Sequence, residues 1–392
     1  MLSELKTNYK LIAIMALGFL LRIAALIFYP DQNFPDAQVY EDSGNSFFAT
    51  GIISSNIYMP LYIIWSHLMS SHFMIKVSDI LFSTASIFLI YQITYIISKN
   101  KTAGLIAALI AAVYPYFIFY SVSRLTETSF VFFVLLAFYY LFNSKYVWAS
   151  IILVLAILIR PTYELLNPIL ILAFGFVYHK LSFKQNMKNL GIYAAIYLIL
   201  MSPWWVHNYV KYGELVRLNL GFGHVLYSGN NPINETGGGV SSSTIKEFDM
   251  SEFSSITNPV EHDKAIKDAA IKFIKENPEK FMKLAIIKFE RFWRLWPFAN
   301  EYTDWKYKII SLLSYGVVLV LSIIFALVYT RRYFPAVLPI YLMFGYLTSV
   351  HMILIGSIRY RFPLEPFMIM FAGIVLGTAV EKWAPKRLKT YL

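Results

Sequence analysis

The segment Phe34–Asp42, FPDAQVYED, gathers acidic side chains directly after the first long hydrophobic stretch of the chain. The wider segment, residues 30–58, has no Lys or Arg and holds four carboxylates close together: Asp31, Asp36, Glu41 and Asp42. Segments without Lys and Arg between membrane spans tend to lie on the extracytoplasmic side. A carboxylate held at the outer membrane surface could accept a proton from a reacting hydroxyl group. We therefore predict that this segment carries a general base.

Charged residues of both signs also mark the predicted outer ends of later hydrophobic stretches. They are Arg124 with Glu127, Arg160 with Glu164, and Arg359 and Arg361 with Glu365. Charges within bilayer helices cost roughly 2.5–3.5 kcal/mol each at the centre and often serve a function. A guanidinium binds phosphate through two parallel hydrogen bonds and keeps its proton. These residues suit a reaction in which a hydroxyl attacks and a phosphate leaves. For any single residue the alternative is snorkelling or ion pairing between helices.

Composition places these residues in a membrane protein. Of 392 residues, 58% are hydrophobic and 15% are charged, whereas soluble domains carry roughly 25% charged residues. The net charge of +11 falls largely in loops between hydrophobic runs and in one exported segment, so we expect no nucleic-acid partner and attribute it to orientation and anionic lipid. The chain has no cysteine, which excludes disulfides, thiolate metal sites and cysteine nucleophiles.

The hydrophobic runs predict an all-α integral membrane protein with about ten transmembrane helices. The runs are residues 10–29, 73–98, 102–121, 125–143, 146–160, 162–179, 189–206, 308–330, 333–354 and 362–380. With a cytoplasmic N-terminus, the short inner loops hold Lys6, Lys10, Lys99, Lys101, Lys145, Lys180, Lys184, Lys188, Arg331 and Arg332. The short outer loops hold Arg124, Arg160, Arg359 and Arg361. This asymmetry predicts a multi-pass plasma-membrane protein with both termini in the cytoplasm.

Three segments follow from these runs: an N-terminal catalytic module (1–206), an extracytoplasmic segment (207–304) and C-terminal membrane helices with a cytoplasmic tail (305–392). Residues 59–69 predict a short interfacial helix in the first segment. The exported segment begins with a Gly-, Ser- and Asn-rich loop, in which Tyr227–Pro232 is expected to cover the site. Its second half, residues 262–296, has helical periodicity interrupted at Asn277-Pro278. We expect a basic amphipathic helix on the outer leaflet, as a platform or for substrate capture.

Several short motifs occur in order along nearly the whole chain. After an Arg-bearing helix come PDAQVY, MPLY, RLTETSF (124–130), LIRPTY (158–163), PWWVHNYVKYGE (203–214), LYSGNNP (226–232) and RYRFPLEP (359–366). With these motifs the chain resembles the GT-C glycosyltransferases, specifically the protein O-mannosyltransferase and aminoarabinose-transferase-like branch. Many members have Glu after the first-loop Asp, where this chain has Ala37, and a basic residue before the next Pro-Leu, where it has Met59.

The resemblance implies sugar transfer from a polyprenyl-phosphate donor at the extracytoplasmic face. It implies that Asp36 is the catalytic base and that Arg359 and Arg361 hold the donor phosphate. Because Met59 replaces a cation, Arg160 and Arg124 become further candidates for that phosphate. The alternative for Asp36 is a helix cap, since a short helix could begin at PDAQVY and end at Gly51; Asp42 is then the second candidate base.

Two more residues are expected at the substrate. Tyr40 lies four residues after Asp36, on the same helix face, where it would orient the base or stack on a sugar. Glu127 would either hydrogen-bond the donor sugar or pair with Arg124.

We therefore expect an inverting transfer to an acceptor hydroxyl on a glycan, lipid or protein. No cofactor is expected beyond the donor substrate, and no divalent metal, because no metal-ligand spacing is evident. The alternatives are a polymerase or ligase using polyprenyl-diphosphate oligosaccharides, and a transporter of lipid-linked sugars. Transporters often carry charges near the midplane and inverted repeats, which this sequence does not display.

Overall fold

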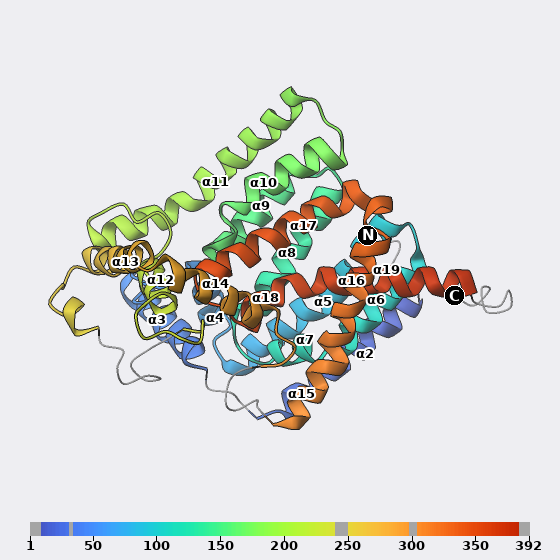
Figure 1. Ribbon diagram of the computed structural model, residues 1–392, viewed down its shortest axis with the longest axis horizontal. Helices are drawn as coiled ribbons and strands as arrows, with labels where there is room; N and C mark the ends of the chain where they lie inside the picture. The colour runs from blue at the N-terminus through green and yellow to red at the C-terminus, as the bar shows by residue number, and fades with distance from the viewer. Residues whose placement is uncertain (1–8, 31–33, 240–249, 298–303, 384–392) are drawn as a thin grey trace.

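The computed structural model describes residues 9–30, 34–239, 250–297 and 304–383, and the elements in these ranges are helices (Figure 1). Asp31, Lys6 and the end of the predicted cytoplasmic tail, residues 384–392, lie outside the described residues.

Six helices of the described chain are long and apolar enough to cross a membrane. They are α2 (Tyr9–Phe28), α5 (His72–Ser98), α11 (Phe183–Tyr212), α15 to α16 (Trp305–Val328), α17 (Thr330–Ile353) and α18 to α19 (Ile358–Trp383). Four apolar helices are shorter: α6 (Lys101–Val113), α8 (Thr126–Phe142), α9 (Tyr146–Ile157) and Leu166–Tyr178, which joins α10 (Leu166–Ala173) to a π-helix. The all-helical, multi-span class is confirmed, whereas the number of crossings stays a prediction.

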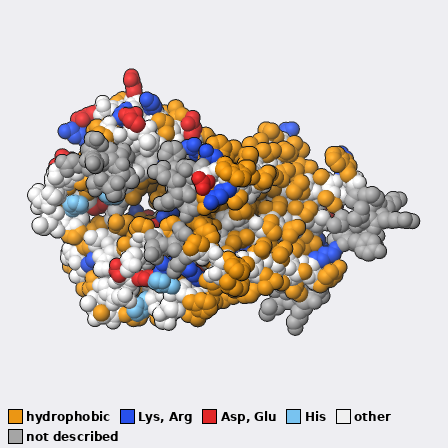
Figure 2. All heavy atoms as spheres, turned by 90° about the horizontal axis from the view of Figure 1, so that it is seen from below, with side chains coloured by type: hydrophobic (Ala, Val, Ile, Leu, Met, Phe, Trp, Pro, Cys, Tyr) orange, Lys and Arg blue, Asp and Glu red, His pale blue; other side chains and the backbone are white. Residues whose placement is uncertain are grey.

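The buried centre of the molecule is formed by α5, α6, α8 and α19. α19 approaches α6 closely at Gly377, where an added Cβ would lie 2.5 Å from the Cα of Ala103. Small residues at such contacts let helices pack backbone against backbone, as in other membrane bundles. Leu198 and Ile199 on α11, by contrast, are exposed. Figure 2 shows a broad hydrophobic surface over the bundle and a mixed polar and charged surface at the other end.

Pro115 ends α6 earlier than the hydrophobic run 102–121 suggests. Proline has no N–H and cannot bond the carbonyl four residues before it, so the chain continues after Tyr114 as a separate short helix, α7 (Pro115–Tyr120). Arg22 supplies donors at this break: its guanidinium bonds the carbonyls of Ala111 (3.4 Å) and Ala112 (3.1 Å). A buried arginine of α2 therefore holds α6 at its end.

The acidic segment after α2 forms the two predicted short helices, α3 (Pro35–Thr50) and α4 (Pro60–Leu68), which pack against each other. Gly51 ends α3 in the left-handed conformation with φ of 78°. Prolines open both helices at a position where the missing N–H costs nothing.

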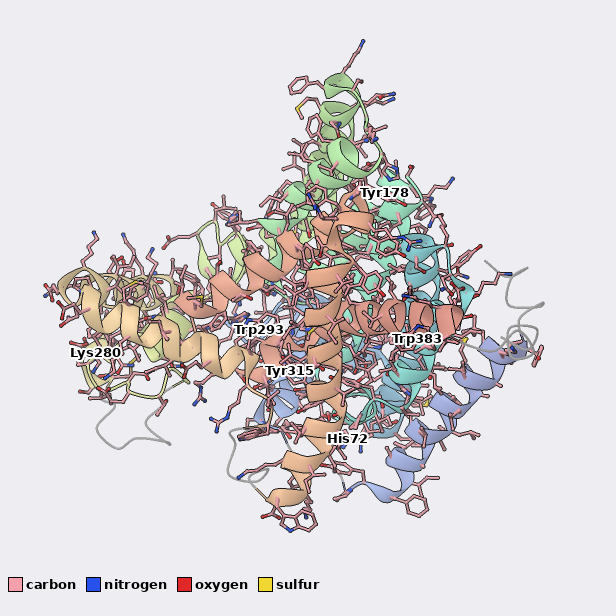
Figure 3. The ribbon with its side chains drawn as sticks, turned by 45° about the vertical axis from the view of Figure 1, so that its right-hand side comes forward. His72, Tyr178, Lys280, Trp293, Tyr315 and Trp383 are labelled. Carbon is pink, nitrogen blue, oxygen red and sulfur yellow. The ribbon has the colours of Figure 1, made fainter. Side chains whose placement is uncertain are left out.

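The segment between α11 and α15 contains α12 (Phe222–Gly229), α13 (Pro259–Glu276) and α14 (Pro278–Trp293). The predicted break at Asn277-Pro278 is confirmed, and the predicted segment boundary at residue 206 falls inside α11. Figure 3 shows α14 running from Lys280, away from the bundle, to Trp293 beside it.

One face of α14 packs against the rest of the protein, and the placement of this helix on the outer leaflet stays a prediction. Leu284, Ala285 and Phe292 are buried, and α14 packs against α17 and α18. Lys288, expected on a basic outer face, is fully buried. Phe289, expected on the same apolar stripe as Phe292, is exposed. Tertiary packing therefore covers Ala285 and Phe292 of the predicted stripe, but it also buries Lys288 and leaves Phe289 exposed.

Candidate functional site

Asp36 lies in the first turn of α3, with its side chain 26% exposed. The residue that caps α3 is Phe34, which makes no side-chain cap bond. The carboxylate of Asp36 instead accepts a hydrogen bond from the Tyr58 hydroxyl on Oδ1, at 2.8 Å. Its Oδ2 lies 2.7 Å from Nη1 of Arg359. Asp36 therefore does not cap α3, and its carboxylate is bound to Tyr58 and Arg359 instead.

Asp36 belongs to a four-residue cluster that we call the carboxylate–guanidinium cluster: Asp36, Arg359, Glu127 and Arg160. Glu127, on the first turn of α8, is fully buried and bonds both Arg359 and Arg160. Arg160 also donates from Nε to the Thr126 hydroxyl, at 2.8 Å. Two carboxylates and two guanidinium groups give the cluster no net formal charge. Four distant segments of the chain thus deliver the predicted residues to one place.

Aromatic side chains hold the Asp36 side of this cluster. Tyr40, predicted on the same face as Asp36, is buried and packs edge-on against Tyr58 with ring centroids 4.8 Å apart. It packs in the same way against Tyr62, at 5.2 Å. Burial and the neighbouring Asp36 charge raise the pKa of Tyr58, so its hydroxyl stays a hydrogen-bond donor. Tyr40 therefore supports Asp36 through Tyr58.

The loop that carries Tyr58 is fixed from α11. Nζ of Lys211 donates to three consecutive carbonyls, Ile53 (2.6 Å), Ser54 (3.1 Å) and Ser55 (2.9 Å). One ammonium has three donor hydrogens, so these contacts can use all of them. Sequence reasoning did not assign Lys211, although it lies within the motif PWWVHNYVKYGE.

Two predicted phosphate ligands lie apart from the cluster. Arg124 pairs with Glu41 at 2.5 Å, and the imidazole of His72 lies 2.8 Å from the same carboxylate. Arg124 thus pairs with Glu41 in place of Glu127, and the other role predicted for Glu127, a hydrogen bond to the donor sugar, stays a prediction. The structure does not bring Arg361 to Asp36 either.

Arg361 is fully buried, bonds Glu365 at 2.8 Å and lies 3.4 Å above the Tyr315 ring. It also donates to the backbone carbonyls of Phe292 and Arg294. These contacts fasten the end of α14 to the last membrane helix.

Residues 354–357, between α17 and α18 (Ile358–Arg361), form a strap that leads into Arg359. Lys288 of α14 donates from Nζ to the carbonyl of Ile353 (3.0 Å) and to Oδ1 of Asn230 (2.8 Å). Arg291 donates from Nε to the carbonyl of Gly356, at 3.1 Å. The contact is close, because a Cβ added at Gly356 would lie 2.4 Å from the Lys288 carbonyl oxygen. α14 therefore holds the backbone that positions Arg359.

Lys288 is expected to make stability depend on pH. Burial lowers its pKa from 10.5 to about 7. Between these values the unfolded state binds the proton and the folded state does not, so the free energy of unfolding rises with pH. We expect a rise from pH 7 to 9 of up to about 1.4 kcal/mol per pH unit, and a flatter profile for Lys288→Met. Unfolding in detergent followed by tryptophan fluorescence measures both.

The matched control is Lys280→Met, which removes a partly exposed lysine of the same helix that pairs with Glu235. That variant is expected to keep the wild-type slope. An unchanged slope in Lys288→Met would contradict the assignment.

A cavity of about 630 Å³ opens beside the cluster. Its wall is mainly aromatic and apolar and includes Tyr29, Phe34, Tyr116, Phe119, Tyr120, Trp296 and Tyr307. Its polar lining includes Ser357, Arg359, Arg291 and Arg294. The cavity thus combines an apolar wall with the guanidinium of Arg359, which contacts Asp36. An amphiphile with an anionic head group would need both.

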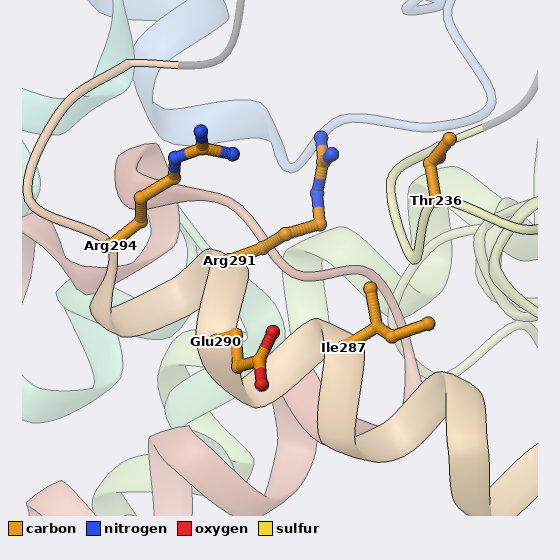
Figure 4. A pocket seen from close by; sticks show the side chains of 5 residues that line it. All are labelled: Thr236, Ile287, Glu290, Arg291 and Arg294. Carbon is orange, nitrogen blue, oxygen red and sulfur yellow. The ribbon is translucent and has the colours of Figure 1, made fainter.

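A second cavity, of about 480 Å³, is lined by Thr236, Ile287, Glu290, Arg291 and Arg294 (Figure 4). The two cavities share Arg291 and Arg294, which sequence reasoning did not select. Arg291 was placed on a basic helix face, and nothing in its spacing distinguishes it from surface lysines of the same helix. Within the described ranges, no group of three or more Asp, Glu or His side chains is arranged to hold a metal ion.

Comparison with known proteins identifies the fold. No protein-family model and no curated protein sequence matches the chain. Among solved structures it is similar to the Archaeoglobus fulgidus oligosaccharyltransferase in the apo form, with a TM-score of 0.57 and 12% identity over 98% of this chain and 52% of the other. It is also similar to AglB from Archaeoglobus fulgidus in complex with an inhibitory peptide and a dolichol-phosphate, with a TM-score of 0.53 and 13% identity over 98% of this chain and 52% of the other.

A third similarity, to ArnT from Cupriavidus metallidurans bound to undecaprenyl phosphate, has a TM-score of 0.48 and 12% identity over 98% of this chain and 62% of the other; it adds no argument. The chain spans about half the length of the oligosaccharyltransferases that it matches. The likeness covers nearly the whole chain and shows the GT-C fold, as the motifs predicted. The branch within that fold class stays a prediction.

Proposed function

We propose that this multi-pass membrane protein with the GT-C fold transfers a sugar from a polyprenyl-phosphate-linked monosaccharide to an acceptor hydroxyl at the extracytoplasmic face. The observation that carries the proposal is the position of Arg359. It contacts Asp36 at 2.7 Å and also lines the aromatic cavity of about 630 Å³. Arg359 thus connects the proposed base, Asp36, with an apolar cavity that could hold a lipid chain, and its guanidinium could bind the donor phosphate.

In the proposed reaction the acceptor oxygen forms a bond to the anomeric carbon of the donor sugar. The bond from that carbon to the phosphate oxygen breaks, and polyprenyl phosphate leaves with the electron pair. Asp36 takes the hydroxyl proton as the new bond forms. A positioned general base contributes roughly 10²–10⁴-fold to the rate, and fixed cations at the departing phosphate add electrostatic stabilisation.

The aromatic cavity is the proposed place for the lipid part of the donor. Its rings offer a wide apolar contact for an isoprenoid chain, while Arg359 and Ser357 lie on its polar side. Glu127 bonds Arg359 and so keeps that guanidinium between Asp36 and the cavity. Arg160, which bonds Glu127, completes the charge balance. Arg124 and Arg361 have no part in this proposal, because Arg124 pairs with Glu41 and Arg361 pairs with Glu365.

The extracytoplasmic location rests on the distribution of Lys and Arg between short loops. The described residues of the acidic segment and Arg359 lie together, as the proposed orientation requires. Both termini are then cytoplasmic. The acceptor is proposed to be a glycan, a lipid or a protein with a free hydroxyl group.

The proposal is tested by release of free polyprenyl phosphate from a panel of polyprenyl-phosphate sugars. Purified protein is incubated with each donor and with mixed membrane acceptors. Release with one sugar, together with its appearance on an acceptor, supports the proposal. Release only from diphosphate-linked oligosaccharides would favour the polymerase or ligase alternative. Net movement of a lipid-linked sugar across vesicles without sugar transfer would favour transport.

Tyr58→Phe is expected to lower kcat for transfer by about tenfold. The substitution keeps the ring packed against Tyr40 but removes the hydrogen bond to Asp36. A hydrogen bond to a charged group contributes about 1.5–3 kcal/mol, part of which orients the base. Steady-state kinetics at saturating donor measures kcat, and Tyr40→Phe, whose ring also packs here, is the control. Equal loss in both variants would show that the effect does not come specifically from the Tyr58–Asp36 hydrogen bond.

Transfer is expected to be insensitive to EDTA, because guanidinium groups supply the cations at the proposed phosphate position. The measurement compares initial rates after chelation and after readdition of Mg²⁺ or Mn²⁺. A rate that falls with EDTA and returns with either metal would contradict this expectation.

A further inference from the structure

The loop between α3 and α4, residues 51–59, is fastened to α11 through the backbone of Ile53. The N–H of Ile53 donates to Nε2 of His207 at 3.0 Å, and its carbonyl accepts from Nζ of Lys211 at 2.6 Å. His207 and Lys211 are four residues apart, so both side chains lie on the same face of the helix. Ile53 itself is buried. One turn of α11 therefore satisfies both backbone polar groups of a buried residue, which would otherwise be costly to leave unpaired.

The hydrogen bonds around His207 fix its tautomer. Nδ2 of Asn208 donates to the carbonyls of Val216 (2.9 Å) and Leu218 (3.1 Å), which uses both amide hydrogens. Oδ1 of Asn208 therefore faces Nδ1 of His207, at 3.2 Å, and an amide oxygen can only accept. Nδ1 accordingly carries the proton, and Nε2 keeps the lone pair that the N–H of Ile53 requires. The two polar neighbours of the ring thus demand the same neutral imidazole.

Aromatic side chains set the orientation of the imidazole. Trp204 stacks on it with ring centroids 4.8 Å apart and an interplanar angle of 9°. Trp204 is itself anchored, because its Nε1 donates to the carbonyl of Leu218 at 2.6 Å. Phe47 of α3 faces the ring from the other helix, at 6.3 Å. A doubly protonated imidazole has two N–H groups and no acceptor, so in this orientation it would direct an N–H at the N–H of Ile53. Protonation of Nε2 and the bond to Ile53 therefore exclude each other.

The surroundings of His207 allow its protonation to follow the pH of the solution. The side chain is partly exposed, and histidine ordinarily titrates between about pH 5 and 8. Among the described residues, Lys211 is the charged group that acts on the imidazole, and its ammonium repels a second positive charge. The ring's partners from α3 and from the loop, Phe47 and Ile53, carry no charge. Acidification thus opposes the contact between α11 and the loop.

We propose that His207 is a positioning residue for the transfer reaction, and that its neutral imidazole holds the loop whose Tyr58 orients Asp36. The proposal rests on the proposed function, in which Asp36 is the base. Tyr58 lies five residues after Ile53 in the same loop and donates to Asp36 at 2.8 Å. A proton on Nε2 releases the Ile53 amide, Tyr58 loses its fixed position, and kcat falls. Donor affinity is kept, because Arg359 retains its bond to Glu127.

The first test measures kcat at saturating donor between pH 5 and 8, with the full chain in detergent and a polyprenyl-phosphate sugar that the protein uses. Glutamine at position 207 can offer an amide oxygen to Ile53 and does not titrate. We expect the ratio of wild-type kcat to that of His207→Gln to fall by up to about tenfold per pH unit once the imidazole protonates. This ratio cancels the effects of pH on Asp36 and on the substrates, which both proteins share. Donor affinity should change less than kcat.

Two variants control this measurement. His207→Asn has a side chain one methylene shorter than glutamine, so we expect it to lose the bond to Ile53 and about tenfold in kcat at pH 7.5. Its kcat relative to that of His207→Gln should then stay constant with pH. His262→Gln removes a histidine of α13 whose ring packs against Phe253. It should keep the wild-type pH dependence.

Hydrogen exchange of the backbone measures the contact without any substrate. Peptides covering residues 51–58 are labelled at pH 5.5 and 7.5, for times scaled to the intrinsic exchange rate at each pH. We expect wild type to lose about tenfold in protection of the Ile53 amide at pH 5.5, as for one lost hydrogen bond. His207→Gln should keep its protection at both values. Peptides from α5 should stay protected in both proteins.

Equal protection of the loop at both pH values in wild type would overturn the proposal. The same pH dependence of kcat in wild type and His207→Gln would overturn it as well, since the imidazole would then have no bearing on the base. A loss of donor affinity as large as the loss of kcat would contradict a role limited to Tyr58 and Asp36. If no donor releases polyprenyl phosphate at any pH, the proposed function fails, and hydrogen exchange still decides whether protonation of His207 frees the loop.

Discussion

Replacing Asp36 by asparagine is expected to lower kcat for sugar transfer by about 10²–10⁴-fold, the usual contribution of a positioned general base. Asparagine keeps the size of the side chain and can still accept the Tyr58 hydrogen bond that the structure shows at 2.8 Å. It cannot take a proton from the acceptor hydroxyl. The donor affinity should change less than kcat, because Arg359 keeps its bond to Glu127. Rates of polyprenyl phosphate release and donor titrations measure the two quantities.

The matched control is Asp42→Asn, which removes an exposed carboxylate of the same helix. Asp42 accepts a hydrogen bond from Gln38 at 3.0 Å and has no contact with the cluster among those described. This variant should keep near-wild-type transfer. Activity retained in Asp36→Asn and lost in Asp42→Asn would move the base to Asp42. Activity retained in both would remove the acidic segment from the reaction.

Glu127→Gln is expected to reduce both stability and transfer. Glu127 is fully buried between two guanidinium groups. Removing one partner of a buried ion pair costs about 3–5 kcal/mol, because a charge is left without compensation. The cost should be at the lower end here, since the Arg359 side chain is 29% exposed. Without Glu127, Arg359 loses the contact that fixes it beside Asp36, and kcat should fall about 10²-fold or more, as when a fixed donor at developing charge is removed.

Thermal unfolding in detergent and donor titration separate these effects. The control is Glu365→Gln, which removes the fully buried partner of Arg361. It should lower the melting temperature in a similar way while leaving donor affinity closer to that of wild type. If both variants lose donor affinity in proportion to their loss of stability, Glu127 acts through folding alone. A stable and active Glu127→Gln variant would contradict its place in the cluster.

Local sequence features predicted several parts of the site correctly. Pro35 and Gly51 marked the start and end of the helix that carries Asp36, because proline favours a first turn and glycine a left-handed end. Asn277-Pro278 marked the break between α13 and α14 for a similar reason. The hydrophobic runs and their low charge predicted a helical membrane protein. Their exact helical lengths were less predictable, since one proline shortened α6.

Partner choice among the charges was not predictable. Arg359 and Glu127 are 232 residues apart in sequence, and Arg160 and Glu127 are 33 apart. The sequence offered Arg124 as an equally good partner for Glu127, but the fold turns Arg124 toward Glu41. Arg361 lies two residues from Arg359, yet it is directed into the core against Glu365 and Tyr315. Which guanidinium meets which carboxylate depends on how helices from distant parts of the chain pack.

The sequence by itself determined the class of the protein and the residues at the start of α3, and it singled out the four charged side chains that form the cluster. These follow from hydrophobic length, loop charge and the backbone limits of proline and glycine, which act over a few residues. Only the tertiary structure decided that Lys288 is buried, that Tyr58 holds Asp36, and that Arg291 and Arg294 face two cavities. The physical reason is that burial and hydrogen-bond partners depend on contacts between segments far apart in the chain, which no local pattern encodes.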